Sequence, residues 1–237
     1  TGGSIYIGCV GPVRTGKSTF IKNFMELMIL PGIQDPNERN RTIDELPQSS
    51  NGKTIMTTEP KFIPNEGVEV SFADQNGEPV RFKAKMIDCV GYMVPGAIGH
   101  MEDDENRMVK TPWFEEEIPF VQAAEIGTRK VIAEHSTVGL VITTDGTVTD
   151  IPREDYQEAE RRVIEELKTL GKPFIVLLNS ANPERETVKL LAGQLAEEYG
   201  VQVLPINAKE LRKEDIEEIL QALLQEFPAK QLSLFFP

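Results

Sequence analysis

Residues 11–19 hold the pattern with the clearest chemistry in this chain. Their sequence, GPVRTGKST, fits the phosphate-loop pattern G-x-x-x-x-G-K-[ST]. The apolar run at residues 5–10 is typical of a buried strand, and residues 19–30 have the apolar spacing of a helix. A glycine loop between a strand and a helix places backbone N–H groups at a helix N-terminus, where they bind anions. The pattern therefore predicts a nucleoside phosphate site.

We expect two side chains of this loop to add specific contacts to those of the backbone. Lys17 can reach the β- and γ-phosphates, and Ser18 can ligate Mg²⁺. Gly11 and Gly16 lack a Cβ atom, so the backbone can approach the phosphates and adopt positive φ. The residues predicted to bind the nucleotide here are Gly11, Val13, Arg14, Thr15, Gly16, Lys17, Ser18 and Thr19.

A second short motif, Asp88-Cys89-Val90-Gly91, follows an apolar strand pattern. The D-x-x-G motif alone is weak evidence for a nucleotide site, but it is strong evidence when it follows a phosphate loop and a strand. Asp88 would orient a Mg²⁺ water, and the Gly91 N–H could donate to the γ-phosphate. The alternative is an Asp that only initiates a turn.

Tyr92 follows Gly91, where many GTPases have a glutamine that positions water. Tyrosine cannot replace that glutamine equivalently. We therefore expect slow hydrolysis, or help from another group or another subunit. Arg14, Arg129 and Lys130 are candidates for that help, and a solvated surface role is the alternative for each.

Three threonines, Thr54, Thr57 and Thr58, lie between the loop helix and the next predicted strand. In switch NTPases a threonine in this position ligates Mg²⁺ only while the γ-phosphate is present. We favour Thr57 and Thr58, which are nearest the strand, as catalytic residues, with Thr58 as the metal ligand. The alternative is a β-prone threonine run that leads into the strand.

The base-binding motif is predicted at Asn179-Ser180-Ala181-Asn182, after another apolar strand. GTP-binding proteins carry N-K-x-D at this place, and the aspartate accepts two hydrogen bonds from guanine. Asn182 offers one acceptor and one donor, which suits adenine better. Asn179 and Asn182 are therefore predicted to contact the nucleotide, which we expect to be ATP.

The composition excludes several classes of protein. The chain has 237 residues, 40% of them hydrophobic, which suits one large α/β domain with or without an added element. A net charge of −13 argues against nucleic acid as the main partner and against broad adhesion to anionic lipid. Two cysteines in predicted strands, Cys9 and Cys89, are typical of core residues in a reducing compartment. The chain begins at Thr1 without Met and ends on an apolar stretch, so we expect it to be an excised fragment.

Short apolar strands alternate with amphipathic helices from residue 121 onward. This alternation predicts a mostly parallel sheet with helices on both faces. Residues 61–63, 68–72 and 80–87 alternate like strands, and the turn signal at Gln75-Asn76-Gly77 predicts that two antiparallel strands flank it. Residues 31–58 and 89–119 show no sustained period and are expected to be irregular. The fold class is thus a three-layer α/β P-loop NTPase fold.

Long stretches of the chain resemble the stage IV sporulation protein A family, the spore-coat morphogenetic ATPases of endospore-forming bacteria. The stretches are TGGSIYIG, VRTGKSTFIK, DELPQS, GKTIMTTEPKF, IDCVGYMVPGA, TPWFEE, AAEIGTRKVI, EHSTVGLVITTDGT and GKPFIVLLNS, between Thr1 and Ser180. The resemblance implies a fold related to translation-factor GTPases but using ATP. It also implies hydrolysis coupled to self-assembly of a static polymer on the forespore surface, in the mother-cell cytoplasm.

The same resemblance implies roles for particular residues and regions. Lys17 would be the phosphate lysine, Asp88 the Walker B-type acid, and Thr57 and Thr58 sensor threonines. The ATPase domain would span residues 1–228, and residues 229–237 would begin a missing C-terminal region. That region would bind a small amphipathic membrane-anchoring peptide and other coat proteins. Two other interpretations stay open: a switch in which nucleotide binding alone regulates a partner, and a scaffold that keeps nucleotide only for stability.

Overall fold

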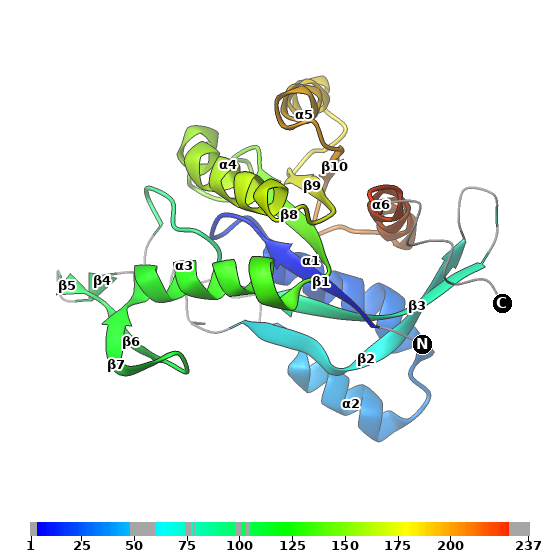
Figure 1. Ribbon diagram of the computed structural model, residues 1–237. Coiled ribbons are helices and arrows are strands. Elements are labelled where there is room, and N and C mark those ends of the chain that lie inside the picture. Colours follow the sequence, from blue (N-terminus) through cyan, green and yellow to red (C-terminus); the bar gives the residue numbers. More distant parts are fainter. Residues whose placement is uncertain are drawn as a thin grey trace.

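The computed structural model describes residues 4–47, 60–73, 77, 79–97, 101–102 and 105–227. Its central strands are β1 Ser4–Val10, β2 Lys61–Ala73, β3 Pro79–Asp88, β8 Val138–Thr144, β9 Phe174–Asn179 and β10 Val203–Ile206. They form one sheet in the order β10-β9-β8-β1-β3-β2 (Figure 1). The pairs from β10 to β3 are parallel, and β2 pairs antiparallel with β3. The predicted α/β fold, with a mostly parallel sheet and one antiparallel hairpin strand, is confirmed.

Helices cover both faces of this sheet. They are α1 Lys17–Phe24, α2 Pro36–Glu45, α3 Phe120–Lys130, α4 Arg153–Thr169, α5 Glu186–Tyr199 and α6 Lys213–Gln225. Shorter turns extend two of them: η1 Met25–Ile29 and η2 Leu30–Gly32 follow α1, and η3 Val131–His135 follows α3. Among the described residues, no helix is both long enough and apolar enough to cross a membrane.

Two separate hydrophobic clusters show which helices pack on which face. Residues of α1, η1 and α6 share one cluster with the sheet, and residues of η3, α4 and α5 share the other. Every residue of β8 and β9 is buried, which explains why these strands are continuous apolar runs rather than alternating ones. Because the strands are parallel, the carboxyl ends of β1, β3, β8, β9 and β10 meet at one edge, where ligands bind in such sheets.

Helix α2 corrects the expectation that residues 31–58 are irregular. Its N-terminus is capped by Asp35, whose carboxylate accepts hydrogen bonds from the N–H groups of Asn37 and Glu38. Pro36 occupies the first helical turn, where a missing N–H has no cost. The helix is polar over most of its surface and buries only Thr42 fully. The sequence feature that could have predicted this helix was therefore its N-terminal cap, and not a periodic pattern of apolar residues.

Residues 89–119 were also expected to be irregular, and the structure corrects this in part. Two short antiparallel pairs form there: β4 Met101–Glu102 with β5 Glu105–Asn106, and β6 Met108–Thr111 with β7 Phe114–Pro119. The longest of these strands has six residues, three of them consecutive glutamates, so it shows no apolar alternation.

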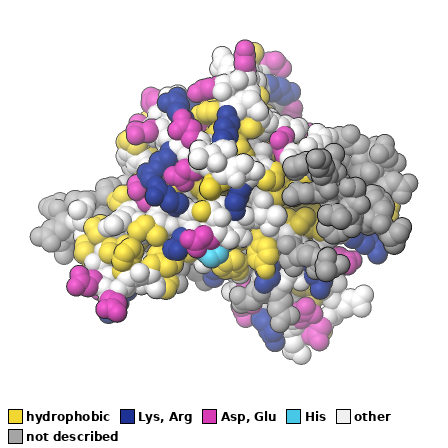
Figure 2. All heavy atoms as spheres, viewed as in Figure 1, with side chains coloured by type: hydrophobic (Ala, Val, Ile, Leu, Met, Phe, Trp, Pro, Cys, Tyr) yellow, Lys and Arg dark blue, Asp and Glu magenta, His cyan; other side chains and the backbone are white. Residues whose placement is uncertain are grey.

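The β6–β7 hairpin extends from the body of the protein beside α3 (Figure 1). Its Met108 and Phe114 side chains are 47% and 46% exposed, and Figure 2 shows hydrophobic side chains gathered over this part of the surface. The Phe120 N–H donates to the Arg107 carbonyl at 2.8 Å, and Lys130 lies over the Trp113 ring at 5.9 Å. The hairpin is therefore attached to both ends of α3.

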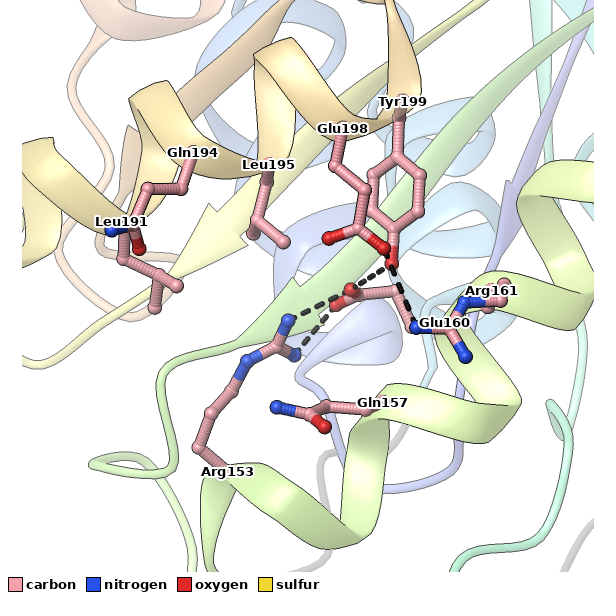
Figure 3. A pocket seen from close by; sticks show the side chains of 9 residues that line it. All are labelled: Arg153, Gln157, Glu160, Arg161, Leu191, Gln194, Leu195, Glu198 and Tyr199. Atoms are coloured by element: carbon pink, nitrogen blue, oxygen red, sulfur yellow. Dashed lines mark hydrogen bonds and ion pairs between the residues drawn. The ribbon is translucent and has the colours of Figure 1, made fainter.

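A fully buried carboxylate, Glu160, ties α4 to β8 and α5. It accepts hydrogen bonds from Arg153 at 2.6 and 2.7 Å, from the Tyr199 hydroxyl at 2.8 Å, and from the Thr143 hydroxyl. Arg153, Glu160 and Tyr199 line part of a cavity of about 180 Å³ between α4 and α5 (Figure 3). Arg153 also donates to the Thr144 carbonyl, so the network fixes the loop that leaves β8 at the ligand edge.

We predict that Glu160→Ala lowers the free energy of unfolding by about 3–5 kcal/mol, because it leaves the guanidinium of Arg153 buried without an anion. Arg153 is only 14% exposed. Glu158→Ala, at an exposed position of the same helix, is the matched control and should change stability by no more than about 0.5 kcal/mol. Urea unfolding measures both, and equal effects of the two variants would contradict the structural role of Glu160.

Candidate nucleotide-binding site

The predicted phosphate loop joins the end of β1 to α1 in a tight backbone path. Gly11 and Gly16 have φ of 142° and 95°. A Cβ atom on Gly11 would collide with the Ile142 carbonyl, and one on Gly16 with the Asn179 amide. Arg14, which has a side chain, also adopts a positive φ of 61°. The loop thus has the strained, close-packed geometry that the glycines were predicted to permit.

Lys17 is almost completely buried and folds back over its own loop. Its Nζ donates to the Pro12 carbonyl at 2.6 Å, and the Thr15 hydroxyl donates to the same oxygen at 3.1 Å. Burial lowers the pKa of Lys17, and the nearby Asp88 carboxylate opposes that shift. The ammonium therefore lies in a poorly hydrated position with only partial compensation of its charge, and a phosphate would supply the missing anion.

Asp88 lies at the end of β3, opposite Cys9 of β1 in the sheet register. Its Oδ2 accepts a hydrogen bond from the Ser18 hydroxyl at 2.7 Å. Its Oδ1 is buried and accepts no well-aligned hydrogen bond from the described residues. Burial raises the pKa of Asp88, opposed by the Ser18 hydrogen bond and the charge of Lys17.

These oxygens fit a magnesium ion. Within the described ranges, no group of three or more His, Cys, Asp or Glu side chains could hold a metal by itself. Mg²⁺, however, usually takes only one or two carboxylates and completes its shell with water and substrate phosphates. A buried carboxylate oxygen without a well-aligned hydrogen bond, beside a serine hydroxyl, is a ligand set of that kind.

The Gly91–Tyr92 segment lies directly against the phosphate loop. The Tyr92 N–H donates to the Gly11 carbonyl at 3.2 Å, and the Val13 N–H donates to the Tyr92 carbonyl at 2.9 Å. A Cβ atom on Gly91 would lie 2.6 Å from Lys17 Nζ and would collide with the Gly11 carbonyl. The structure therefore brings the predicted phosphate ligands Lys17 and Gly91 together. The Val13 N–H, which belongs to the predicted nucleotide-binding loop, donates its hydrogen bond to the Tyr92 carbonyl in this structure.

The Gly91 N–H has an acceptor that sequence reasoning missed. It donates to the Thr128 hydroxyl of α3 at 3.1 Å, and Thr128 is completely buried. Thr128 is 37 residues away from Gly91 along the chain, and no motif marks it. Only the packing of α3 against the end of β3 identifies this partner.

The Tyr92 side chain is directed toward α4. Its hydroxyl donates to Glu166 at 2.6 Å, and the Arg162 guanidinium lies over its ring at 4.1 Å. Burial and the contact with Glu166 raise the pKa of Tyr92 well above its ordinary value. A phenol held in this way cannot position water as a glutamine would.

Two of the three cations considered as activating groups have acidic neighbours on the helices. Arg129 pairs with Glu166 at 3.6 Å, and Lys130 pairs with Glu134 at 3.2 Å. These contacts favour the surface interpretation for both. Arg14 remains a prediction, because it is partly buried inside the phosphate loop itself.

Asn179, at the end of β9, uses both ends of its amide within the protein. Its Nδ2 donates to the Thr15 carbonyl at 2.9 Å, and its Oδ1 accepts from the Ala208 N–H at 3.0 Å. Asn23 of α1 donates to the Ala208 carbonyl at 2.6 Å. Asn179 therefore holds the phosphate loop against the loop that follows β10.

Asn182 follows Asn179 by three residues and is exposed. Its N–H donates to the Ser180 hydroxyl at 3.1 Å. The Thr147 hydroxyl accepts from the Ala181 N–H at 2.9 Å and donates to Asp145 at 2.6 Å. These contacts join the loops after β8 and β9, and they make Asp145 a turn-stabilising residue. Because Ser180 is fully buried, it cannot stack under a base as the lysine of N-K-x-D does.

Several predicted positions lie outside the described residues. They are Thr54, Thr57, Thr58 and the terminal residues 228–237. The first residue of β2, Lys61, pairs with Asp88, so the described chain resumes next to the metal candidate. The roles of Thr57 and Thr58, and of Thr19, stay predictions.

Comparison with known proteins gives one consistent result. A family model described as "Stage IV sporulation protein A, ATPase domain" matches residues 1–228. The chain is similar over its full length to proteins called Stage IV sporulation protein A from Clostridioides difficile (53% identity), Bacillus subtilis (54%) and Bacillus anthracis (52%). It covers 48%, 47% and 47% of these proteins, so the chain spans about half the length of the curated relatives it matches.

We predict that Tyr92→Phe lowers the free energy of unfolding by about 1.5–3 kcal/mol, because it removes a hydrogen bond to a charged group. The ring and its stacking on Arg162 are retained. Tyr6→Phe, whose hydroxyl has no described hydrogen bond, is the matched control and should have little effect. Thermal or urea unfolding measures the difference, and a neutral Tyr92→Phe would show that the Glu166 contact adds nothing.

Proposed function

This chain belongs to the family of stage IV sporulation protein A ATPase domains, and from that premise we propose that it binds ATP with Mg²⁺ and hydrolyses it slowly. In this proposal the hydrolysis cycle drives self-assembly of the basement layer of the spore coat. The observation that carries the nucleotide part is the convergence of Lys17, the Ser18–Asp88 pair and Gly91 at the end of β1 and β3. Each of these groups was predicted as a phosphate or metal ligand.

Ser18 and Asp88 would hold Mg²⁺, with Thr58 as a further predicted ligand. Bound there, the ion would neutralise phosphate charge and orient the β- and γ-phosphates. The Lys17 ammonium would leave the Pro12 carbonyl for phosphate oxygens, which offer it a stronger charge-assisted bond. The backbone of the tight loop, supported by Asn179, would bind the remaining phosphate oxygens.

The side chains near the site support a slow reaction. Tyr92 replaces the water-positioning glutamine, and its hydroxyl is bound to Glu166. Arg129 and Lys130 are paired on the helix surface. A cycle that switches an assembly state needs few turnovers, so a slow hydrolysis rate is compatible with the proposed role.

For the cellular location and the binding partners, the proposal rests only on membership of the family. We place the protein in the mother-cell cytoplasm, on the forespore surface, as a homopolymer. A small amphipathic membrane-anchoring peptide and other coat proteins would bind a C-terminal region beyond these residues, and nucleic acid would not be a partner. These parts stay predictions.

A second candidate function is a switch in which ATP binding, without hydrolysis, regulates a partner. The burial of the Tyr92 side chain favours this alternative, because the usual water-positioning group is missing. The two functions differ in what a non-hydrolysable ATP analogue does: it would arrest a hydrolysis-driven assembly and support a binding-driven one.

We predict that Lys17→Ala weakens ATP binding about 10- to 100-fold and abolishes phosphate release, because the β- and γ-phosphates lose their charge-assisted partner. Lys22→Ala, five residues along α1 at a position where the side chain is 39% exposed, is the matched control and should bind as the native chain does. Titration with a fluorescent ATP analogue gives the affinities, and a phosphate-release assay gives the rates.

The same substitution at the corresponding lysine of a full-length relative should prevent sedimentable polymer from forming with ATP. Unchanged affinity of Lys17→Ala would contradict the nucleotide site. Polymer formed equally well with a non-hydrolysable analogue would instead select the switch function.

We also predict that GTP displaces bound ATP only at a higher concentration than ATP itself, because Asn182 cannot accept two hydrogen bonds from guanine. Asn182→Asp should shift the preference toward GTP, whereas Asn182→Ala should weaken ATP binding without that shift. Competition titrations measure the ratio. Displacement by GTP at an equal or lower concentration would rule out the proposed role of Asn182.

A further inference from the structure

We propose that Thr128 is a positioning residue that holds the Gly91 N–H in the absence of a γ-phosphate and releases it when ATP binds. The protein would then distinguish ATP from ADP through α3. This inference rests on the proposed function, because it takes the γ-phosphate to lie beside Lys17 and Gly91.

The contact between Thr128 and Gly91 is a specific one. Thr128 is fully buried, and its hydroxyl accepts from the Gly91 N–H at 3.1 Å while lying 3.8 Å from the Cys89 sulfur. Gly91 has a φ of 97°, so its peptide group adopts an orientation that an L side chain rarely permits. Because glycine has no Cβ atom, its φ can change over a wider range than that of any other residue, which a reorientation of this peptide requires.

The Thr128 hydroxyl and a γ-phosphate oxygen would compete as acceptors for the Gly91 N–H. The Gly91 backbone lies against Lys17 Nζ, where a phosphate would bind, and its N–H is now directed to α3 instead. A single N–H makes one strong hydrogen bond, so donation to a phosphate oxygen requires that the bond to Thr128 be broken. ADP has no γ-phosphate and would leave that bond intact.

Loss of the bond between Gly91 and Thr128 would affect contacts that α3 makes far from the nucleotide. Arg129, next to Thr128, pairs with Glu166, which also accepts the Tyr92 hydroxyl. The N-terminal end of α3 carries the β6–β7 hairpin through the bond from Phe120 to the Arg107 carbonyl. The exposed Met108 and Phe114 would therefore be attached to a helix whose contact with the site depends on the γ-phosphate.

Thr128→Val tests the idea, because valine keeps the shape of threonine and removes the acceptor. Calorimetric titration of the 237-residue chain gives Kd for a non-hydrolysable ATP analogue and for ADP. We expect the ratio of the ADP Kd to the analogue Kd to rise about tenfold in Thr128→Val, because the buried Gly91 N–H has no competing acceptor left. Thr128→Ser retains the hydroxyl and should keep the native ratio.

If Thr128 only filled space, its replacement would weaken the binding of both ligands equally. A ratio of the ADP Kd to the analogue Kd that is unchanged or lowered in Thr128→Val would therefore overturn the proposal, even though the native chain binds ATP. If the native chain binds neither ligand, the proposed function falls and this inference falls with it.

A second measurement needs no variant that could fail to fold. Hydrogen exchange of the native chain should show a change in α3 and in the Gly91 peptide with the analogue, but not with ADP. Identical exchange with both ligands would also overturn the role of Thr128.

Discussion

The parallel pairing of β1 with β3 determines where every phosphate-directed group lies. In this register Cys9 is opposite Asp88, so the phosphate loop and the D-x-x-G segment leave the sheet side by side. The neighbouring bonds between Gly11, Val13 and Tyr92 continue that pairing beyond the strands. Because side chains alternate between faces, a slip of one residue would turn Asp88 away from Ser18. The covering helices and both clusters keep this register fixed.

Burial near this register gives the site its electrostatic character. The chain carries a net charge of −13, yet Lys17 lies in a region where burial disfavours every charge. Burial also raises the pKa of Cys89 to about 11 and that of Cys9 well above its ordinary value, so both thiols stay protonated. A polyanion therefore encounters a local cation that the surface charge does not reveal.

The sequence predicted the parts of the site that depend on local spacing. Lys17, Ser18 and Asp88 follow strands within short motifs, and parallel strands bring such ends together. It could not predict Thr128 or Glu166, because the choice of one threonine or one glutamate depends on how α3 and α4 pack. Asn179 was predicted to contact the nucleotide, which stays a prediction, and the sequence did not reveal that its amide also holds the phosphate loop. Helix α2 was missed because its signal was the pair Asp35-Pro36, which an apolar period does not detect.

The position of Tyr92 has a consequence for how such a chain can vary. Its hydroxyl is bound by Glu166 and its ring by Arg162, and Arg162 in turn pairs with Glu125. Exchange of Tyr92 for glutamine would remove the phenol that donates to Glu166 and the ring beneath Arg162, while the ion pairs of these groups with Arg129 and Glu125 would remain. Neighbouring residues in one network do not contribute additively. A change at residue 92 is therefore coupled to the residues of α3 and α4 that surround it, and its effect on stability depends on what stands at positions 162 and 166.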